Sequence, residues 1–264
     1  MDVNQLIESI TQEICKRLET EGKLTANQNM ALYDESYGKY CDHTVLRAYT
    51  KQSIVKRFCD EAKTYKAAAV CVNPIHVPFV RAQLAGTGIK TCTVVGFPLG
   101  ANKPLIKATE AAEAIKDGAQ EIDMVINIGA LRDDNLKLVY EDIKGVVGAA
   151  KGKAEVKVII ETCYLNTEQK IKACILCKLA GADYVKTSTG FGTDGAKVED
   201  IRLIRQVVGD SLKIKASTGV DTRSDAQKMI EAGAVRLGTS RTLQIVTGND
   251  QLKSVSADNQ PPKE

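Results

Sequence analysis

The chain has 264 residues, 44% of them hydrophobic, and its 36 Lys and Arg against 33 Asp and Glu give a formal net charge of +3. A chain of this length and hydrophobic content can bury a large core, which excludes global disorder, and its nearly balanced charge lacks the basic excess of a nucleic-acid binder. No stretch approaches the roughly 18 consecutive apolar residues of a membrane span, so the composition predicts a soluble protein without a nucleic-acid or membrane partner.

Two segments flank the repeating pattern of the chain. Residues 1–38 are polar and amphipathic, and we expect them to form an N-terminal helical extension of one or two helices. Asp2, Glu8 and Glu13 interrupt the first apolar residues, which is unlike a secretion signal. Residues 248–264 are too polar to bury and are expected to form a flexible tail.

Between these segments, short β-branched runs alternate with helical patterns. The runs recur on average about every 28 residues, the length of one strand–helix unit. The predicted strands cover residues 40–46, 67–72, 90–97, 121–127, 156–162, 183–188, 212–217 and 234–238. Eight such units without a linker predict one α/β domain over residues 39–247, a closed (β/α)₈ TIM barrel, with an open doubly wound sheet as the alternative.

The helices between the runs have recognisable ends. Ser53 and Thr167 are expected to cap two helices, and Thr222 or Ser224 a third. A glycine can end a helix by taking the left-handed conformation. Three pairs end a helix and lead into a strand in this way: Gly118-Ala119, Gly181-Ala182 and Gly233-Ala234.

Eight cysteines in a chain without a secretion signal predict a reducing compartment, which we take to be the cytoplasm. Only Cys174 and Cys177 form a C-x-x-C pair, within a helical pattern that also contains Ile171 and Ile175. That spacing is typical of a buried helix face, and the two histidines of the chain supply a zinc site poorly. We therefore predict core packing for the pair and no metal site. Redox or metal chemistry is the alternative.

Alternate residues of a barrel strand point into the lumen, and the others face the helices. In the run 121–127 the even-numbered residues are apolar, which leaves Asp123 on the opposite, inward face. Several charges in one lumen are costly unless they have a task, so inward charges are the first candidates for a site. The same alternation directs three lysines inward: Lys157, Lys186 and Lys215.

Six short motifs occur in the order known from one enzyme family. They are Asp-His-Thr at 42–44, Val-Cys-Val-Asn-Pro at 70–74, Val-Gly-Phe-Pro-Leu-Gly at 95–100, Glu-Ile-Asp-Met-Val-Ile-Asn at 121–127, Val-Lys-Thr-Ser-Thr-Gly-Phe-Gly at 185–192 and Lys-Ala-Ser at 215–217. In these motifs the chain resembles the deoxyribose-phosphate aldolase family. The resemblance implies a TIM barrel and a class I aldolase that needs no metal or other cofactor. Its implied reaction is the reversible cleavage of 2-deoxy-D-ribose 5-phosphate to D-glyceraldehyde 3-phosphate and acetaldehyde, and a homodimer or homotetramer is usual for such barrels.

The resemblance also assigns catalytic roles. Lys186 matches the lysine that forms a Schiff base with the substrate, and Lys215 matches the lysine that tunes it. A lysine pKa of about 10.4 leaves the amine almost fully protonated at pH 7, and a second ammonium about 4 Å away lowers that pKa by roughly three units. Asp123 matches the acid–base carboxylate, which acts with Lys215 and a water molecule. The structural alternative for Lys186 is a buried ion pair with Asp123.

Other matching positions line the cavity of the family. Asp42, Thr44 and Lys157 are expected to bind substrate hydroxyls or relay protons, and Cys71 corresponds to a cysteine near the substrate pocket. Each carries a structural alternative. Asp42 could cap the first strand, Lys157 could pair with Glu161, and Cys71 could serve packing alone.

Glycines and a hydroxyl after the last strands form the predicted phosphate site, because barrel enzymes often bind phosphate at the loops after the seventh and eighth strands. The candidates are Gly190, Gly219, Gly238 and Ser240. Thr218 stands where the family usually has glycine, and Arg241 stands where it usually has a small residue. Arg241 either covers the barrel rim or adds hydrogen bonds to the substrate phosphate.

Two other functions fit parts of the sequence. Residues 190–195 read G-x-G-x-x-G after a predicted strand, as in the dinucleotide site of an NAD-dependent oxidoreductase, and Asp221 stands where a ribose-binding acid could lie. However, this motif lies in the sixth unit instead of the first and leaves the inward lysines without a role. A catalytically inactive phosphate-binding barrel is the other alternative, and the departures at Thr218 and Arg241 leave it open.

Overall fold

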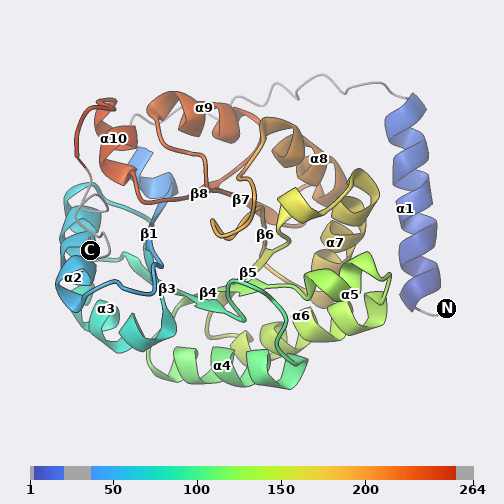
Figure 1. The fold of residues 1–264 in the computed structure, drawn as a ribbon, viewed down its shortest axis with the longest axis horizontal. Coiled ribbons are helices and arrows are strands. Elements are labelled where there is room, and N and C mark those ends of the chain that lie inside the picture. Colours follow the sequence, from blue (N-terminus) through green and yellow to red (C-terminus); the bar gives the residue numbers. More distant parts are fainter. Residues whose placement is uncertain (1–2, 21–36, 254–264) are drawn as a thin grey trace, which may run out of the picture.

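The computed structural model describes residues 3–20 and 37–253, to which every structural statement here refers. Parallel strands form a closed barrel in which each strand pairs with the next and the last pairs with the first (Figure 1). The strands are β1 (Cys41–Val45), β2 (Ala69–Val72), β3 (Lys90–Val95), β4 (Glu121–Val125), β5 (Glu155–Ile159), β6 (Tyr184–Lys186), β7 (Lys213–Ser217) and β8 (Arg236–Thr239). The predicted (β/α)₈ barrel is confirmed, and the open sheet is wrong.

Helices surround this barrel, and at least one helix follows each strand. The α-helices are α1 (Val3–Thr20), α2 (Gln52–Thr64), α3 (Val77–Gln83), α4 (Pro104–Lys116), α5 (Ile128–Arg132), α6 (Leu136–Ala150), α7 (Thr167–Ala180), α8 (Val198–Val208), α9 (Arg223–Glu231) and α10 (Thr242–Thr247), and the 3₁₀ turns are η1 (Tyr37–Tyr40), η2 (Pro74–His76) and η3 (Thr162–Tyr164). The even-numbered residues Ile122 and Met124 of β4 are buried in the core cluster outside the barrel, as the alternation predicts. Within the described part of the chain, no helix has the length and apolar character that a membrane crossing requires.

The predicted N-terminal helix is present as α1, which packs against α6 and α7 (Figure 1). Ile7 is fully buried there, and Lys172 of α7 lies 2.7 Å from a carboxylate oxygen of Glu8. A second helix of the extension, and the tail beyond residue 253, fall outside the described residues. Up to that point the tail turns back toward α10, where Gln244 Nε2 donates a hydrogen bond to the Leu252 carbonyl at 2.7 Å.

Several helix and strand ends differ from the prediction. α2 begins at Gln52, so Ser53 lies inside its first turn, and Asn166 instead of Thr167 caps α7. Thr222 caps α9 as predicted. The glycines of the three Gly-Ala pairs all have positive φ, as expected: Gly118, Gly181 and Gly233.

Several strands, among them β4 and β5, are shorter at their carboxyl ends than the sequence pattern predicts. β4 stops at Val125, because the side chain of Asn127 accepts a hydrogen bond from the N–H of Ala130 and caps α5. β5 stops at Ile159, and Glu161 then takes a left-handed conformation with φ 52°. The apolar pattern continues past both ends, so periodicity alone does not show where the chain leaves the barrel.

All eight cysteines lie in the described residues and are free thiols. Cys174 and Cys177 are buried in the main core cluster, and burial raises the pKa of both thiols. The prediction that this C-x-x-C pair serves core packing is confirmed.

Candidate active site

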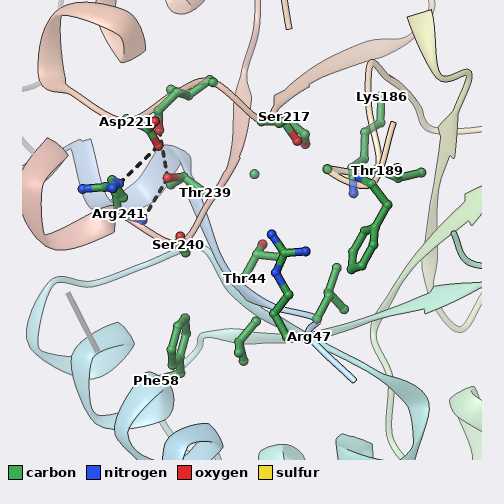
Figure 2. Close-up of a pocket in the computed structure, with 18 of the residues that line it drawn as sticks. Thr44, Arg47, Phe58, Lys186, Thr189, Ser217, Asp221, Thr239, Ser240 and Arg241 are labelled. Carbon is green, nitrogen blue, oxygen red and sulfur yellow. Dashed lines mark hydrogen bonds and ion pairs between the residues drawn. The ribbon is translucent and has the colours of Figure 1, made fainter. Parts of the chain in front are cut away.

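A pocket of about 490 Å³ lies at the carboxyl ends of the strands, the end at which TIM-barrel enzymes place their active sites (Figure 2). The segments after β1, β6, β7 and β8 form its walls. Thr44 lies near the end of β1, Arg47 follows that strand, and Lys186 lies at the end of β6. Residues from the first and from the last two of the predicted motifs therefore meet at this pocket.

Seven charged side chains fill the lumen below this pocket and contact one another; we call them the lumen network. They are Asp42 of β1, Glu121 and Asp123 of β4, Lys157 of β5, Lys186 of β6, Lys215 of β7 and Arg236 of β8. All except Arg236 are buried. The structure thus places the predicted acid and the three predicted lysines together in the lumen.

Asp123 lies at the centre of the lumen network. Its Oδ2 accepts hydrogen bonds from Lys186 Nζ and Lys215 Nζ, both at 2.7 Å, and its Oδ1 lies 3.2 Å from Lys157 Nζ. Because Lys186 Nζ and Lys215 Nζ contact the same oxygen, the two nitrogens lie no farther apart than twice 2.7 Å. The ion pair between Lys186 and Asp123 is present, and Lys186 is also the network residue that lines the pocket.

Asp42 is a member of the lumen network and not a strand cap. It is fully buried, and its two carboxylate oxygens accept hydrogen bonds from Lys215 and from Arg236, each at 2.5 Å. Arg236 also donates to Glu121 at 3.0 Å near the opposite end of the lumen. Asp42 therefore connects the groups below the pocket to those at the amino ends of the strands.

Lys157 does not pair with Glu161, the partner considered from the sequence. Its Nζ forms a hydrogen bond and ion pair with Glu121 and lies 3.5 Å from Asp42. Glu161 instead accepts hydrogen bonds from the backbone N–H and the hydroxyl of Thr189. Since Thr189 lines the pocket, Glu161 positions the loop after β6.

The contacts within the lumen network set the charges of its members. Burial raises the pKa of Asp42 and of Asp123, but the surrounding cations outweigh burial and hold both pKa values below their usual range. Burial lowers the pKa of Lys157 and of Lys215, but the neighbouring carboxylates outweigh it and raise both pKa values. Lys215 therefore keeps a positive charge at neutral pH, close to Lys186.

Asp42→Asn is expected to destabilise the protein in a pH-dependent way. Removal of one partner of a buried ion pair costs about 3–5 kcal/mol, so the variant should unfold at a lower urea concentration at pH 7. A carboxylate with a depressed folded pKa stabilises the fold above its unfolded pKa of about 3.9, and this contribution is lost as the pH falls. The difference in unfolding free energy between the wild type and the variant should therefore begin to narrow below about pH 5 and continue to narrow as the pH falls toward the depressed folded pKa of Asp42.

The matched control is Asp60→Asn, because Asp60 forms only exposed pairs, with Lys56 and Lys63 on α2. Exposed pairs contribute about 0–1 kcal/mol, so this variant should unfold nearly like the wild type throughout. A difference for Asp42→Asn that stays constant as the pH falls would contradict the charge states derived above.

Most of the predicted substrate-binding residues line the pocket. They are Thr44, Gly190, Gly219, Gly238 and Ser240. Cys71 does not line it: the residue is fully buried and pairs in register with Cys92 of β3. This position favours the packing alternative for Cys71.

The loops after β6, β7 and β8 approach one another closely. A Cβ atom on Gly238 would lie 2.3 Å from Ser217 Oγ, so a side chain at this position would force Ser217 of β7 to move. Gly190 and Gly219 have positive φ, and so does Thr218, with φ 70°. The left-handed region costs a residue with a side chain about 1–2 kcal/mol, so Thr218 adds local backbone strain to the pocket wall.

The G-x-G-x-x-G run does not have the structure of a dinucleotide site. Such a site needs the motif to open a helix, but α8 begins only at Val198, after a loop. Asp221, considered as a ribose-binding acid, lies 3.4 Å from Arg241 Nε. The geometry does not support the oxidoreductase alternative.

Several residues of this site were not predicted from the sequence, among them Glu121 and Arg236 of the lumen network, and Glu161 and Arg47 at the pocket. Glu161 positions Thr189 by accepting a hydrogen bond from its backbone N–H. The location of Glu161 at the end of a predicted strand is the signal that could have indicated it. Arg47 lies three residues after Thr44, and its guanidinium lies 5.0 Å from the centre of the Phe191 ring. Its position directly after the first strand is the feature that could have indicated it, because site loops follow the strands of a barrel.

Comparison with known proteins shows the family of the chain. Residues 38–248 match the model of the family described as DeoC/LacD family aldolase. The deoxyribose-phosphate aldolase of Enterococcus faecalis is 58% identical over 207 residues, which are 78% of this chain and 94% of that protein. The deoxyribose-phosphate aldolase of Clostridium tetani is 54% identical over 208 residues, covering 79% of this chain and 96% of that protein.

Solved structures show the same fold. The deoxyribose phosphate aldolase from Aeropyrum pernix, described as a tetramer, superimposes with a TM-score of 0.76 at 27% identity and covers 92% of this chain and 97% of its own. An aldolase named QR15 superimposes with the same score of 0.76 at 40% identity, covering 80% of this chain and 94% of its own. On the family match and on these relatives, the chain belongs to the DeoC/LacD family of aldolases.

Proposed function

We propose that the protein is a class I aldolase that reversibly cleaves 2-deoxy-D-ribose 5-phosphate to D-glyceraldehyde 3-phosphate and acetaldehyde. The observation that carries this proposal is the Lys186 amine at the pocket wall, with Asp123 Oδ2 at 2.7 Å and Lys215 on the same oxygen. A Schiff-base aldolase needs an amine, a proton carrier and a fixed positive charge together, and these three side chains supply them.

The proposed chemistry begins with Lys186. Its neutral amine attacks the C1 aldehyde carbon of the open-chain sugar, and loss of water gives a protonated Schiff base. Asp123, acting with Lys215 and a water molecule, accepts the proton of the C3 hydroxyl while the C2–C3 bond breaks. The electron pair moves into the iminium group, glyceraldehyde 3-phosphate leaves, and the enamine remains on Lys186. Protonation of C2 and hydrolysis then release acetaldehyde.

The charge balance of the lumen network supports this assignment. Its four basic side chains face three carboxylates, so loss of one proton balances the set. Lys186 is the member that a substrate in the pocket can reach. Lys157, with Glu121 and Asp42, holds Asp123 and Lys215 in place, and we propose Thr44 and the glycine loops as contacts for the substrate.

A coupled assay tests the proposed reaction. The purified protein is incubated with 2-deoxyribose 5-phosphate, and acetaldehyde is measured by its reduction with NADH and alcohol dehydrogenase. We expect turnover that persists in excess EDTA. Absence of cleavage together with phosphate binding would favour the inactive barrel, and loss of activity on chelation would contradict a class I mechanism.

We also propose a homodimer or homotetramer working in the cytoplasm, with residues 39–247 as the catalytic domain. The assembly is supported by the tetramer described for the Aeropyrum pernix relative, and the compartment by the eight free thiols. Light scattering should give two or four times the chain mass of 28.5 kDa.

A further inference from the structure

Two arginines line the pocket, and their surroundings differ. The Arg241 guanidinium lies 3.4 Å from a carboxylate oxygen of Asp221, which already balances its charge. Figure 2 shows this pair together at one side, while the Arg47 side chain extends toward the middle of the pocket. Among the residues that the structure describes, no carboxylate lies within ion-pair distance of Arg47, and its guanidinium donates no hydrogen bond.

The contact of Arg47 with Phe191 places the guanidinium next to the loop after β6, which contains Gly190, one of the predicted phosphate-site residues. Phe191 directly follows Gly190, and its ring centre lies 5.0 Å from the Arg47 guanidinium carbon. The ring in turn packs edge-on against Phe97, with the two ring centres 5.4 Å apart. Arg47 thus reaches from the end of β1 to the loop after β6, across the pocket that both line.

A cation held against an aromatic ring keeps its charge available to a stronger partner. The contact with the ring is weaker than charge-assisted hydrogen bonds to phosphate, whose oxygens the planar guanidinium can bind in pairs. The guanidinium can therefore leave the ring for a phosphate dianion in the pocket, and the ring holds it near that position in advance.

We infer that Arg47 binds the phosphate group of the substrate and so determines the preference of this site for phosphorylated aldoses. The inference rests on the proposed function. It also revises the expectation for Arg241: because Asp221 already pairs with its guanidinium, Arg241 should contribute less than Arg47 to phosphate binding.

The test compares Arg47→Leu with three further variants on 2-deoxyribose 5-phosphate and on unphosphorylated 2-deoxyribose. Charge-assisted hydrogen bonds of this kind correspond to roughly a ten- to hundredfold change in affinity, so KM for the phosphorylated sugar should rise by that factor. The kcat/KM for 2-deoxyribose should change by less than about twofold, because it offers the guanidinium no phosphate. Arg47→Lys should recover part of the loss.

Arg202→Leu removes the same charge from the exposed surface of α8 and should leave both substrates unaffected. Arg241→Leu should raise KM for the phosphorylated sugar less than Arg47→Leu does. Equal losses on both substrates for Arg47→Leu, or a larger effect from Arg241→Leu, would overturn the inference while cleavage by the wild type still supported the aldolase function.

A binding measurement separates this inference from the proposed reaction. In calorimetric titration with inorganic phosphate, Arg47→Leu should bind at least about tenfold more weakly than the wild type and than Arg202→Leu. This result needs no turnover, so it stands or fails independently of aldol cleavage. Unchanged phosphate affinity in Arg47→Leu would overturn the role of Arg47.

Discussion

Lys186→Ala should lower the turnover of 2-deoxyribose 5-phosphate by at least about 10⁴-fold, because it removes the covalent step together with the amine. Within the described part of the chain, no other lysine lines the pocket, so no neighbouring amine can replace it. The same residue should be labelled when the wild type is treated with acetaldehyde and borohydride, which reduces the Schiff base to an ethylated amine. Peptide mapping by mass spectrometry identifies the modified lysine.

The matched control for this experiment is Lys197→Ala. Lys197 lies in the loop between β6 and α8, where it is half exposed and pairs with Asp194 at 2.8 Å. Its removal should change neither turnover nor labelling. Borohydride labelling of a lysine other than Lys186 in the wild type would show that the nucleophile is assigned wrongly.

Lys215→Leu should move the acidic limb of the pH–rate profile upward by about two to three pH units, following the interaction of two like charges about 4 Å apart. At pH 7 this corresponds to a loss of roughly a hundred- to a thousandfold, with partial recovery at high pH. The reason is that the fixed charge of Lys215, which Asp123 and Asp42 maintain, no longer disfavours a second ammonium at the pocket.

A control for the charge of Lys215 and a test of the proton carrier complete this series. Lys213→Leu removes an exposed lysine of the same strand, paired with Glu155 at 2.7 Å, and should leave the profile in place. Asp123→Asn should still trap the Schiff base, slowly, but fail in carbon–carbon bond exchange. If the profile of Lys215→Leu coincides with that of the wild type, the paired-lysine mechanism is wrong.

Much of the fold follows from local rules that the sequence displays. The strand–helix alternation and the Gly-Ala helix ends predict the closed barrel, and the period of two places Asp123 and Lys186 inside it. The strand ends were less predictable, because Asn127 and Glu161 leave the barrel through a side-chain cap and a left-handed turn that periodicity does not encode.

The contacts across the lumen were predicted only in part. Alternation gives the direction of each side chain, but which charges meet depends on the stagger of the strands around the barrel. Arg236 begins β8, yet it reaches Asp42 and Glu121 from there and closes the lumen network. The role of Arg47 depends on the paths of the loops after β1 and β6. No local sequence pattern predicts that these loops bring Arg47 into contact with Phe191.

The lumen network also constrains how this sequence can diverge. Its members come from six strands, so a mutation that removes one charge disturbs ion pairs with side chains on distant parts of the chain. The cost of about 3–5 kcal/mol is a large share of the 5–15 kcal/mol that stabilises a typical domain. Such positions are therefore expected to change together with their partners, for example Glu121 with Arg236 and Lys157. The pocket rim, which includes Thr218 and Arg241, lies outside the lumen network and can vary one substitution at a time. New substrate preferences should therefore evolve at the rim while the lumen network is retained.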